Sequence, residues 1–331
     1  GALSRELIEE IIFPRLKNNR YRELSDAATL PLDWKAAAQG SGPELLFTTD
    51  TYTVQPYMFP GGDIGKLAVY GTCNDLAVSG GRPLYFSIGM VLEEGFPVAD
   101  LERIADSIAE AAEETGVAVV TGDTKVVPRG RGGGIYINSS GIGRPEVSFP
   151  LSPARIVPGD KVICSGPVGS HGIALLAARE QLSAGKAPVS DAASLYPLCA
   201  GLYGFGEGLR FIRDATRGGA AAVCNEIAAG GNFGMLVEED RFPVLANVRT
   251  LSEILGLNPL EVANEGVFIA VVSSAVEQEA LKRLHALPGG SAAACVGEIT
   301  EEHAGKVVLT TAIGGRRILG FPRGLLLPRI C

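Results

Sequence analysis

The fold of this chain is decided by residues 47–83, which read FTTDTYTVQPYMFPGGDIGKLAVYGTCNDLAVSGGRP. The segment 44–49 is apolar and alternating, as in a strand, and it runs into Asp50. A glycine pair then precedes Asp63, and residues 64–78 carry apolar side chains at helical spacing. Acids therefore stand where predicted strands and helices end, and carboxylates at such positions point into the clefts of α/β proteins.

The alternation of strands and helices continues outward from this stretch. We predict helices over residues 3–13, 99–115, 171–182, 217–229 and 276–286, and strands over residues 84–92, 117–120, 135–142, 161–165, 233–238, 267–273, 292–299 and 306–312. Residues 144–160 hold four prolines and little periodicity, which favours a domain boundary. The pattern predicts an α/β protein with mixed sheets and two domains, residues 1–150 and 151–319, followed by a tail over residues 320–331.

The composition excludes several classes of protein. Lysine and arginine number 29 and aspartate and glutamate 37, which gives a net charge of −8, whereas general binders of nucleic acid or anionic membranes are basic. The sequence has neither a run of 18 apolar residues nor a signal peptide at its start. Six scattered cysteines without a CxxC pair favour buried thiols in a reducing cytoplasm. We expect a cytoplasmic protein that binds neither nucleic acid nor membrane.

Five acids stand at predicted strand or helix ends: Asp50, Asp75, Asp123, Asp214 and Glu265. Three converging carboxylates form the hard-oxygen site that Mg²⁺ prefers. Lys125 and Arg217 follow two of these acids and could neutralise phosphate oxygens. Because the chain has no P-loop and no GxGxxG after a strand, the pattern indicates Mg²⁺-ATP bound by other means. Each acid taken alone could equally be a helix cap or a turn residue, and Asp214 fits a cap well.

The last twelve residues, GFPRGLLLPRIC, are apolar but contain two prolines. Proline excludes a regular helix or central strand, so the tail is expected to be extended and mobile and to dock in a groove. Cys331 ends the chain, two residues after Arg329. The alternative is a disordered end with an incidental cysteine.

Several motifs together carry a family resemblance. They are the stretch 47–83, TGDTKVV (121–127), DATRGG (214–219), NPLEVANEG (258–266) and the terminal PRIC (328–331). TTD, GGDIGK, NDLA and GDTK resemble the ATP-binding proteins of the aminoimidazole-ribonucleotide-synthetase-like superfamily. The PRIC ending resembles the HypE family of hydrogenase maturation factors, the carbamoyl dehydratases, and the similarity runs along essentially the whole chain.

This resemblance implies a two-domain fold, a homodimer and an ATP site between the domains near the dimer interface. It also implies that a partner carbamoyltransferase carbamoylates the terminal cysteine. The protein then uses ATP to dehydrate the S-carboxamide to S-cyanide, a thiocyanate. A scaffold complex of maturation proteins passes the cyanide ligand to the iron of a [NiFe] hydrogenase.

The resemblance also implies roles for individual residues. Asp50, Asp75 and Asp123 would contact Mg²⁺ and phosphate, with Lys125 on phosphate and Arg217 as a further phosphate contact. Asp63 and Lys66 would line the nucleotide site. Glu265 is the first candidate for the base on the carboxamide nitrogen, Asp75 is the second, and Cys331 would carry the substrate. Asn74 and Asn264 could hydrogen-bond the carboxamide or hold turns.

Some features depart from the family pattern. An aspartate is expected before His171-Gly172, where the chain has Ser170, and residues 130–134 (GRGGG) lack an expected acid. The family's N-terminal glycine-rich loop would be ending where this sequence begins. Two other functions stay open, namely a small-molecule phosphotransferase of the selenophosphate synthetase or thiamine-phosphate kinase type, and a non-catalytic carrier. Neither needs both the acidic cleft and the terminal cysteine.

Overall fold

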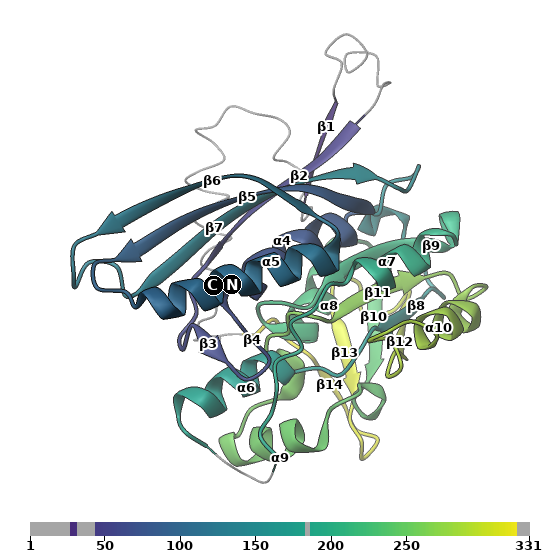
Figure 1. The fold of residues 1–331 in the computed structure, drawn as a ribbon. Coiled ribbons are helices and arrows are strands. Elements are labelled where there is room, and N and C mark those ends of the chain that lie inside the picture. Colours follow the sequence, from purple (N-terminus) through teal and green to yellow (C-terminus); the bar gives the residue numbers. More distant parts are fainter. Residues whose placement is uncertain (1–26, 32–43, 183–185, 323–331) are drawn as a thin grey trace, which may run out of the picture.

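The computed structural model describes residues 27–31, 44–182 and 186–322, and its core consists of two sheets (Figure 1). The strands of the first sheet follow the order β1-β2-β7-β5-β6. Their bounds are β1 (Ala28–Pro31), β2 (Glu44–Tyr52), β5 (Gly81–Glu93), β6 (Ala118–Val127) and β7 (Ile135–Pro145). A small hairpin of β3 (Met58–Phe59) and β4 (Gly62–Asp63) leads into the first helix. All pairings in the first sheet are antiparallel except that of β5 with β6.

Helices α4 (Ile64–Val78) and α5 (Val98–Thr115) cover one face of the first sheet (Figure 1). Along β5, Phe86 and Leu92 are buried toward these helices, while Tyr85 and Val91 alternate with them and are exposed. Because side chains alternate along a strand, the exposed residues mark the opposite face. Among the described residues, no helix covers that opposite face.

The second sheet has the order β14-β13-β10-β12-β8-β11-β9. Its strands are β8 (Lys161–Cys164), β9 (Leu209–Asp214), β10 (Gly234–Glu238), β11 (Phe268–Val272), β12 (Ala294–Thr300), β13 (Val307–Thr310) and β14 (Arg316–Ile318). The helices of this half are α6 (Ser170–Arg179), α7 (Tyr196–Tyr203), α8 (Gly219–Ala229), α9 (Ala246–Leu255) and α10 (Glu277–His285). In β8, Val162 and Cys164 pack into the core beside α8, whereas Ile163 packs with α7 and α10, so helices lie on both faces.

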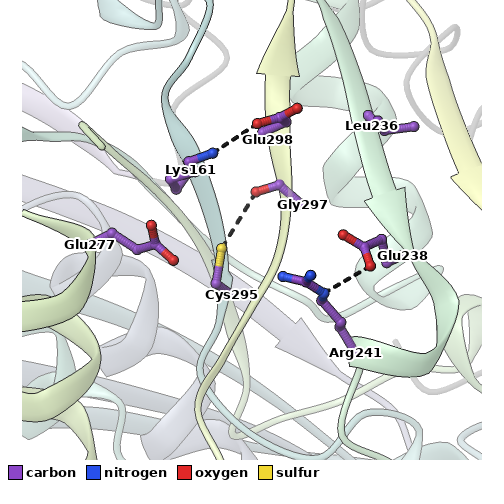
Figure 2. A pocket seen from close by; sticks show the side chains of 8 residues that line it. All are labelled: Lys161, Leu236, Glu238, Arg241, Glu277, Cys295, Gly297 and Glu298. Carbon is purple, nitrogen blue, oxygen red and sulfur yellow. Dashed lines mark hydrogen bonds and ion pairs between the residues drawn. The ribbon is translucent and has the colours of Figure 1, made fainter. Parts of the chain in front are cut away.

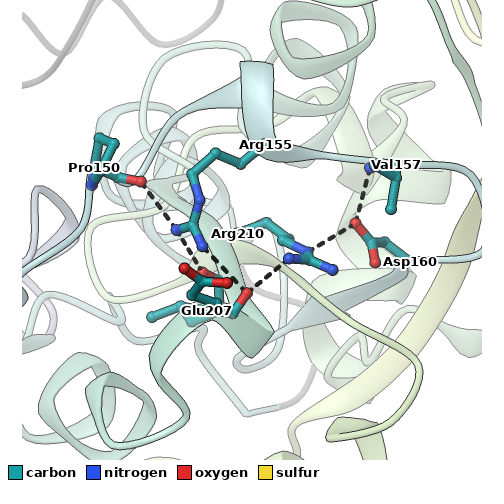
Figure 3. Close-up of polar contacts among 7 residues, drawn as sticks. Pro150, Arg155, Val157, Asp160, Glu207 and Arg210 are labelled. Carbon is teal, nitrogen blue, oxygen red and sulfur yellow. Dashed lines mark hydrogen bonds and ion pairs between the residues drawn. The ribbon is translucent and has the colours of Figure 1, made fainter.

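Two arginines anchor the connection between the sheets (Figure 3). Arg155, in the 3₁₀ turn Pro153–Arg155, donates to the carbonyl oxygens of Pro150 and Leu209 at 3.1 and 3.2 Å. Arg210 pairs with the buried carboxylate of Asp160 at 3.2 Å. These contacts fasten the proline-rich connection to the second sheet, while the exact domain boundary at residue 150 stays a prediction.

The sequence located most elements of the described part. The predicted helix 64–78 coincides with α4, and the predicted helix 99–115 is α5. The strand expected over residues 117–120 was predicted too short, because β6 pairs with β5 as far as Val127. Asp123 therefore lies inside a strand, and Asp50 likewise lies inside β2, which continues to Tyr52. The predicted helix 3–13 lies outside the described residues.

Within the described ranges, no helix is both long enough and apolar enough to cross a membrane.

Candidate active site

The first part of the site is built on the helix-facing side of β2. Thr48, Asp50 and Tyr52 alternate along the strand and so share one face. The Tyr52 hydroxyl donates to Asp50 Oδ2 at 3.0 Å, and the Thr48 hydroxyl donates to Asp75 Oδ2 at 2.8 Å. Strand β2 and helix α4 thereby bring two predicted site acids to the same region.

Glu265 joins this region from the other half of the chain. It lies in the turn between the 3₁₀ segment Pro259–Glu261 and β11, and it is 5% exposed. Burial raises the pKa of Tyr52 well above its usual value, and the charges of Asp50, Asp75 and Glu265 raise it further. Asp50 thus bonds directly to this buried tyrosine, while Asp75 and Glu265 act on it through their charges.

The charge around Glu265 is mostly negative. Burial raises the pKa of Glu265 well above its usual value, and the carboxylates of Asp191, Asp214 and Asp50 raise it further. Arg217 acts in the opposite direction and lowers this pKa. Arg217 of the DATRGG motif thus acts on the charge of Glu265, while its predicted phosphate contact stays a prediction.

Asn74 and Asn264 hold backbone turns. The Asn74 amide nitrogen donates to the carbonyl oxygens of Ala193 and Glu265 at 3.0 and 3.2 Å, and its Oδ1 accepts from Leu195 N at 2.7 Å. The Asn264 amide donates to Ala215 O at 2.7 Å and accepts from Gly169 N at 2.7 Å. Both are buried with these partners, which favours the turn-holding interpretation.

Asp63 and Lys66 already have structural partners. The Asp63 side chain caps α4 by accepting the N–H groups of Gly65 and Lys66, and the Ser107 hydroxyl also donates to it. The Lys66 ammonium pairs with Glu110 of α5 at 3.3 Å. These contacts explain both residues without a ligand, and their nucleotide contacts stay predictions.

Asp123 and Lys125 lie on the other side of the first sheet. The strand register places one row of residues side by side: Thr51, Asn138, Gly89 and Asp123. In that row the Asn138 amide donates to the exposed Thr51 hydroxyl at 2.8 Å, whereas neighbouring Ser139 is buried and faces α4. The register thus puts Asp123 on the open face, away from Asp50, and Lys125 shares that face.

The three predicted Mg²⁺ ligands do not form one cluster. Within the described part of the chain, no three histidine, cysteine, aspartate or glutamate side chains lie close enough together to hold a metal ion. A shell of three carboxylates from a single chain therefore does not fit. Mg²⁺ is commonly held by only one or two carboxylates plus substrate phosphates, and Asp50 and Asp75 remain candidates for that role.

The structure shows the surroundings of two segments that depart from the family pattern, His171 and residues 130–134. His171 is buried, its Nδ1 lies 2.8 Å from the Ser190 hydroxyl, and its ring packs edge-on against Phe59. Burial lowers the pKa of His171 to about 3, so the ring is neutral. The loop at residues 130–134 closes on Glu93, whose carboxylate accepts the N–H groups of Gly130 and Gly134 at 2.5 and 3.0 Å.

A cavity of about 200 Å³ lies away from all these residues (Figure 2). It opens on the second sheet and contains the ion pairs Lys161–Glu298 and Arg241–Glu238. None of the predicted site residues lines it. We therefore do not assign the active site to this cavity.

The motifs missed two residues of the site. Tyr52 stands two positions after Asp50, and strand periodicity alone could have placed both on one face. Asp191 accepts the backbone N–H groups of Glu265 and Gly266, and no motif marked it. Cys331, the predicted substrate carrier, lies outside the described residues.

Comparisons with known proteins identify both halves of the chain. The AIR synthase related N-terminal domain matches residues 25–144, and the corresponding C-terminal domain matches residues 157–310. The carbamoyl dehydratase HypE of Cupriavidus necator is 41% identical over 331 residues, covering 100% of this chain and 92% of that protein.

Two solved structures are similar along nearly the whole chain. A HypE–HypF complex has a TM-score of 0.88 at 40% identity and covers 96% of this chain and 99% of that one. A HypE structure in complex with ATP has a TM-score of 0.84 at 41% identity and covers 100% of this chain and 97% of that one. Identity at this level over the full length, with both domain matches, shows that the chain belongs to the HypE family of carbamoyl dehydratases, which are hydrogenase maturation proteins.

Proposed function

We propose that this chain uses ATP to convert an S-carbamoyl group on its own Cys331 into S-cyanide. The observation that carries the proposal is that Asp50, Asp75 and Glu265 come together from both halves of the fold: Asp50 bonds to Tyr52, and Asn74, next to Asp75, donates to the carbonyl oxygen of Glu265. Membership of the HypE family, the terminal cysteine and the relative solved with ATP support the same reaction.

The reaction has two steps. Hydroxide is a poor leaving group, so the carboxamide oxygen first attacks the γ-phosphorus of ATP. The O–P bond forms, the bond to ADP breaks, and one N–H proton leaves, which gives an S-linked imidate phosphate. The C–O bond then breaks, phosphate departs with the electron pair, and the second N–H proton leaves to form the nitrile.

The chain's own residues supply the base and part of the charge balance. Glu265 takes a proton from nitrogen, with Asp75 as the second candidate. Burial and neighbouring acids raise the pKa of Glu265, which makes its ionised form a stronger base. Arg217 neutralises charge that develops on the transferred phosphoryl group. Lys125 is the further phosphate contact in this proposal.

We propose that Mg²⁺ is bound by two carboxylates of the chain, not by three. Asp50 and Asp75 would hold the ion together with the phosphates of ATP, and the ion would neutralise phosphate charge. Asp123 lies on the open face of the sheet, away from Asp50. We therefore propose that Asp123 helps to bind Mg²⁺-ATP but is not a third ligand of the ion beside Asp50 and Asp75. Calorimetry on Asp123→Asn checks this point, because unchanged Mg²⁺-ATP affinity would remove the residue from the site.

The proposed partners are a second copy of the chain, a carbamoyltransferase and a scaffold complex of maturation proteins. The relative solved as a HypE–HypF complex supports the carbamoyltransferase as a direct partner. Exposed apolar residues on the uncovered face of the first sheet support a homodimer: Phe47, Tyr85 and Val91. Buried free thiols at Cys73, Cys164, Cys199 and Cys224 support the cytoplasm as the location.

Intact mass is the experiment that tests the reaction. The protein is incubated with its carbamoyltransferase and carbamoyl phosphate, and then with Mg²⁺-ATP. We expect the mass of one carbamoyl group to appear, followed by loss of one water only when ATP is present. Cys331→Ala is the control, and it should show neither change while it still binds ATP.

The other outcomes select between the alternatives. An adduct that never loses water would support the non-catalytic carrier. Absence of any adduct on Cys331, together with ATP hydrolysis stimulated by a small molecule, would support the phosphotransferase.

A further inference from the structure

Asp191 ties its own segment of the chain to the turn that carries Glu265. Its carboxylate accepts the backbone N–H of Glu265 at 3.3 Å and that of Gly266 at 3.2 Å. The backbone N–H of His171, at the start of α6, acts on the same carboxylate and lowers its pKa. A carboxylate that accepts several N–H groups fixes their relative positions, because each bond to a charged acceptor is stronger than a neutral one.

The segment that carries Asp191 is itself held from several sides. Ser190 N donates to Pro60 O of the β3–β4 hairpin at 2.9 Å, and the Ser190 hydroxyl bonds with His171. Asn74 of α4 holds Ala193 and Leu195 through its amide group. Elements of both halves therefore fix the position from which Asp191 reaches the Glu265 turn.

The turn after Glu265 packs closely against the backbone of Asp191 at Gly266. A Cβ atom added to Gly266 would lie 1.9 Å from Asp191 O, so only glycine fits there. The Asn74 amide also donates to Glu265 O at 3.2 Å. The backbone on both sides of the Glu265 side chain is thus tied to the Asp191 segment and to α4.

We infer that Asp191 is a positioning residue that holds the backbone of the Glu265 turn in the geometry the base needs. This inference rests on the proposed role of Glu265 as the base. Asp191 acts through Glu265 and does not contact the substrate itself. A misplacement of about 1 Å lowers a rate by up to ~100-fold, so loosening this turn should slow dehydration.

Asp191 also contributes to the charge at the base. Desolvation raises the pKa of Asp191 to about 6, against the lowering effect of the N–H groups. The charged groups that face Glu265 are Asp191, Asp214, Asp50 and Arg217. Removing the charge of Asp191 lowers the pKa of Glu265, so the acidic limb of the rate profile should move to lower pH.

The test measures single-turnover dehydration of carbamoylated protein, with Asp191→Asn, Glu265→Gln and the double variant in parallel. Asparagine keeps the shape but replaces one acceptor oxygen with an NH₂ group, so the charge is lost and the N–H groups of Glu265 and Gly266 have one acceptor oxygen between them. We expect Asp191→Asn to be slower by about 10- to 100-fold. The double variant should be no slower than Glu265→Gln, because coupled residues are non-additive.

Asp160→Asn is the matched control. Asp160 is also buried and accepts a backbone N–H, from Val157 at 2.9 Å, but it pairs with Arg210 in the connection between the sheets. We expect this control to lower stability and leave the single-turnover rate unchanged. If Asp191→Asn does not fold, Asp191→Glu replaces it, because glutamate keeps the charge and shifts the carboxylate by one methylene.

The outcomes separate the two proposals. A wild-type rate in the Asp191 variant, or a double variant whose two losses multiply, overturns the positioning role while the base remains. A wild-type rate in Glu265→Gln instead removes the base, and with it the premise of this inference.

Discussion

Glu265 is a carboxylate whose burial opposes its own ionisation. Its pKa in the folded protein is raised above the unfolded value, so the folded state binds the proton more tightly. The stability that this group contributes is present at low pH and is lost as the pH rises through the raised pKa. Catalysis needs the opposite state, because only the ionised group can accept a proton.

We therefore predict that Glu265→Gln loses activity and gains stability at higher pH. Dehydration should fall by at least ~100-fold, the usual contribution of a general base. The acidic limb of the wild-type rate profile should lie above the ordinary glutamate pKa of about 4.3. Urea unfolding across pH should show the variant gaining stability relative to the wild type as pH rises. A stability difference that does not change with pH would contradict the raised pKa.

At the scale of elements, two ion pairs of the second sheet differ in burial. Arg210 pairs with Asp160, whose side chain is 3% exposed, whereas Arg241 and Glu238 are 53% and 39% exposed. Removing Arg210 leaves a buried carboxylate with fewer partners and should cost about 1–3 kcal/mol. Removing Arg241 should cost at most ~1 kcal/mol, because exposed pairs are screened by water.

Urea unfolding of Arg210→Ala and Arg241→Ala measures this difference directly. The expected result is a lower midpoint for Arg210→Ala with an unchanged slope, which indicates a change in stability alone. Equal losses in the two variants would mean that the Asp160 pair does not anchor the connection between the sheets.

The helices also differ in how well the sequence predicts them. Helix α5 was located because its apolar residues recur at helical spacing, and α4 was located as a run of 15 residues after Asp63 although it is buried on nearly all sides. Helix α7 was missed, since its eight residues are mostly apolar and show little periodicity. Asp191 was missed for another reason: its partners are backbone N–H groups 74 and 75 positions away, which no side-chain pattern records. Asp50 and Glu265 stand in motifs and were found.

At the scale of the whole molecule, the first sheet has two unequal faces. One face packs on α4 and α5, and the other exposes Tyr85 at 50% and Val91 at 36% among the described residues. Strand β6 lies at the edge of this sheet, and nearly all of its residues are exposed. An exposed edge strand beside an apolar face is a surface that proteins normally cover. These features favour a second copy of the chain on this face.

Sedimentation velocity on a Tyr85→Lys, Val91→Lys variant tests that arrangement. Two lysines on the shared face would lose water without gaining partners, so the dissociation constant of the dimer should rise by at least ~100-fold. Val98→Lys is the control, because Val98 is 70% exposed at the start of α5, on the other side of the sheet, and should leave the dimer intact. A double variant that still dimerises would place the interface elsewhere, and a wild-type protein that stays monomeric at every concentration would contradict the dimer itself. Because Asp123 and Lys125 lie on this same face, loss of the dimer should also weaken ATP binding, which calorimetry on the monomeric variant measures.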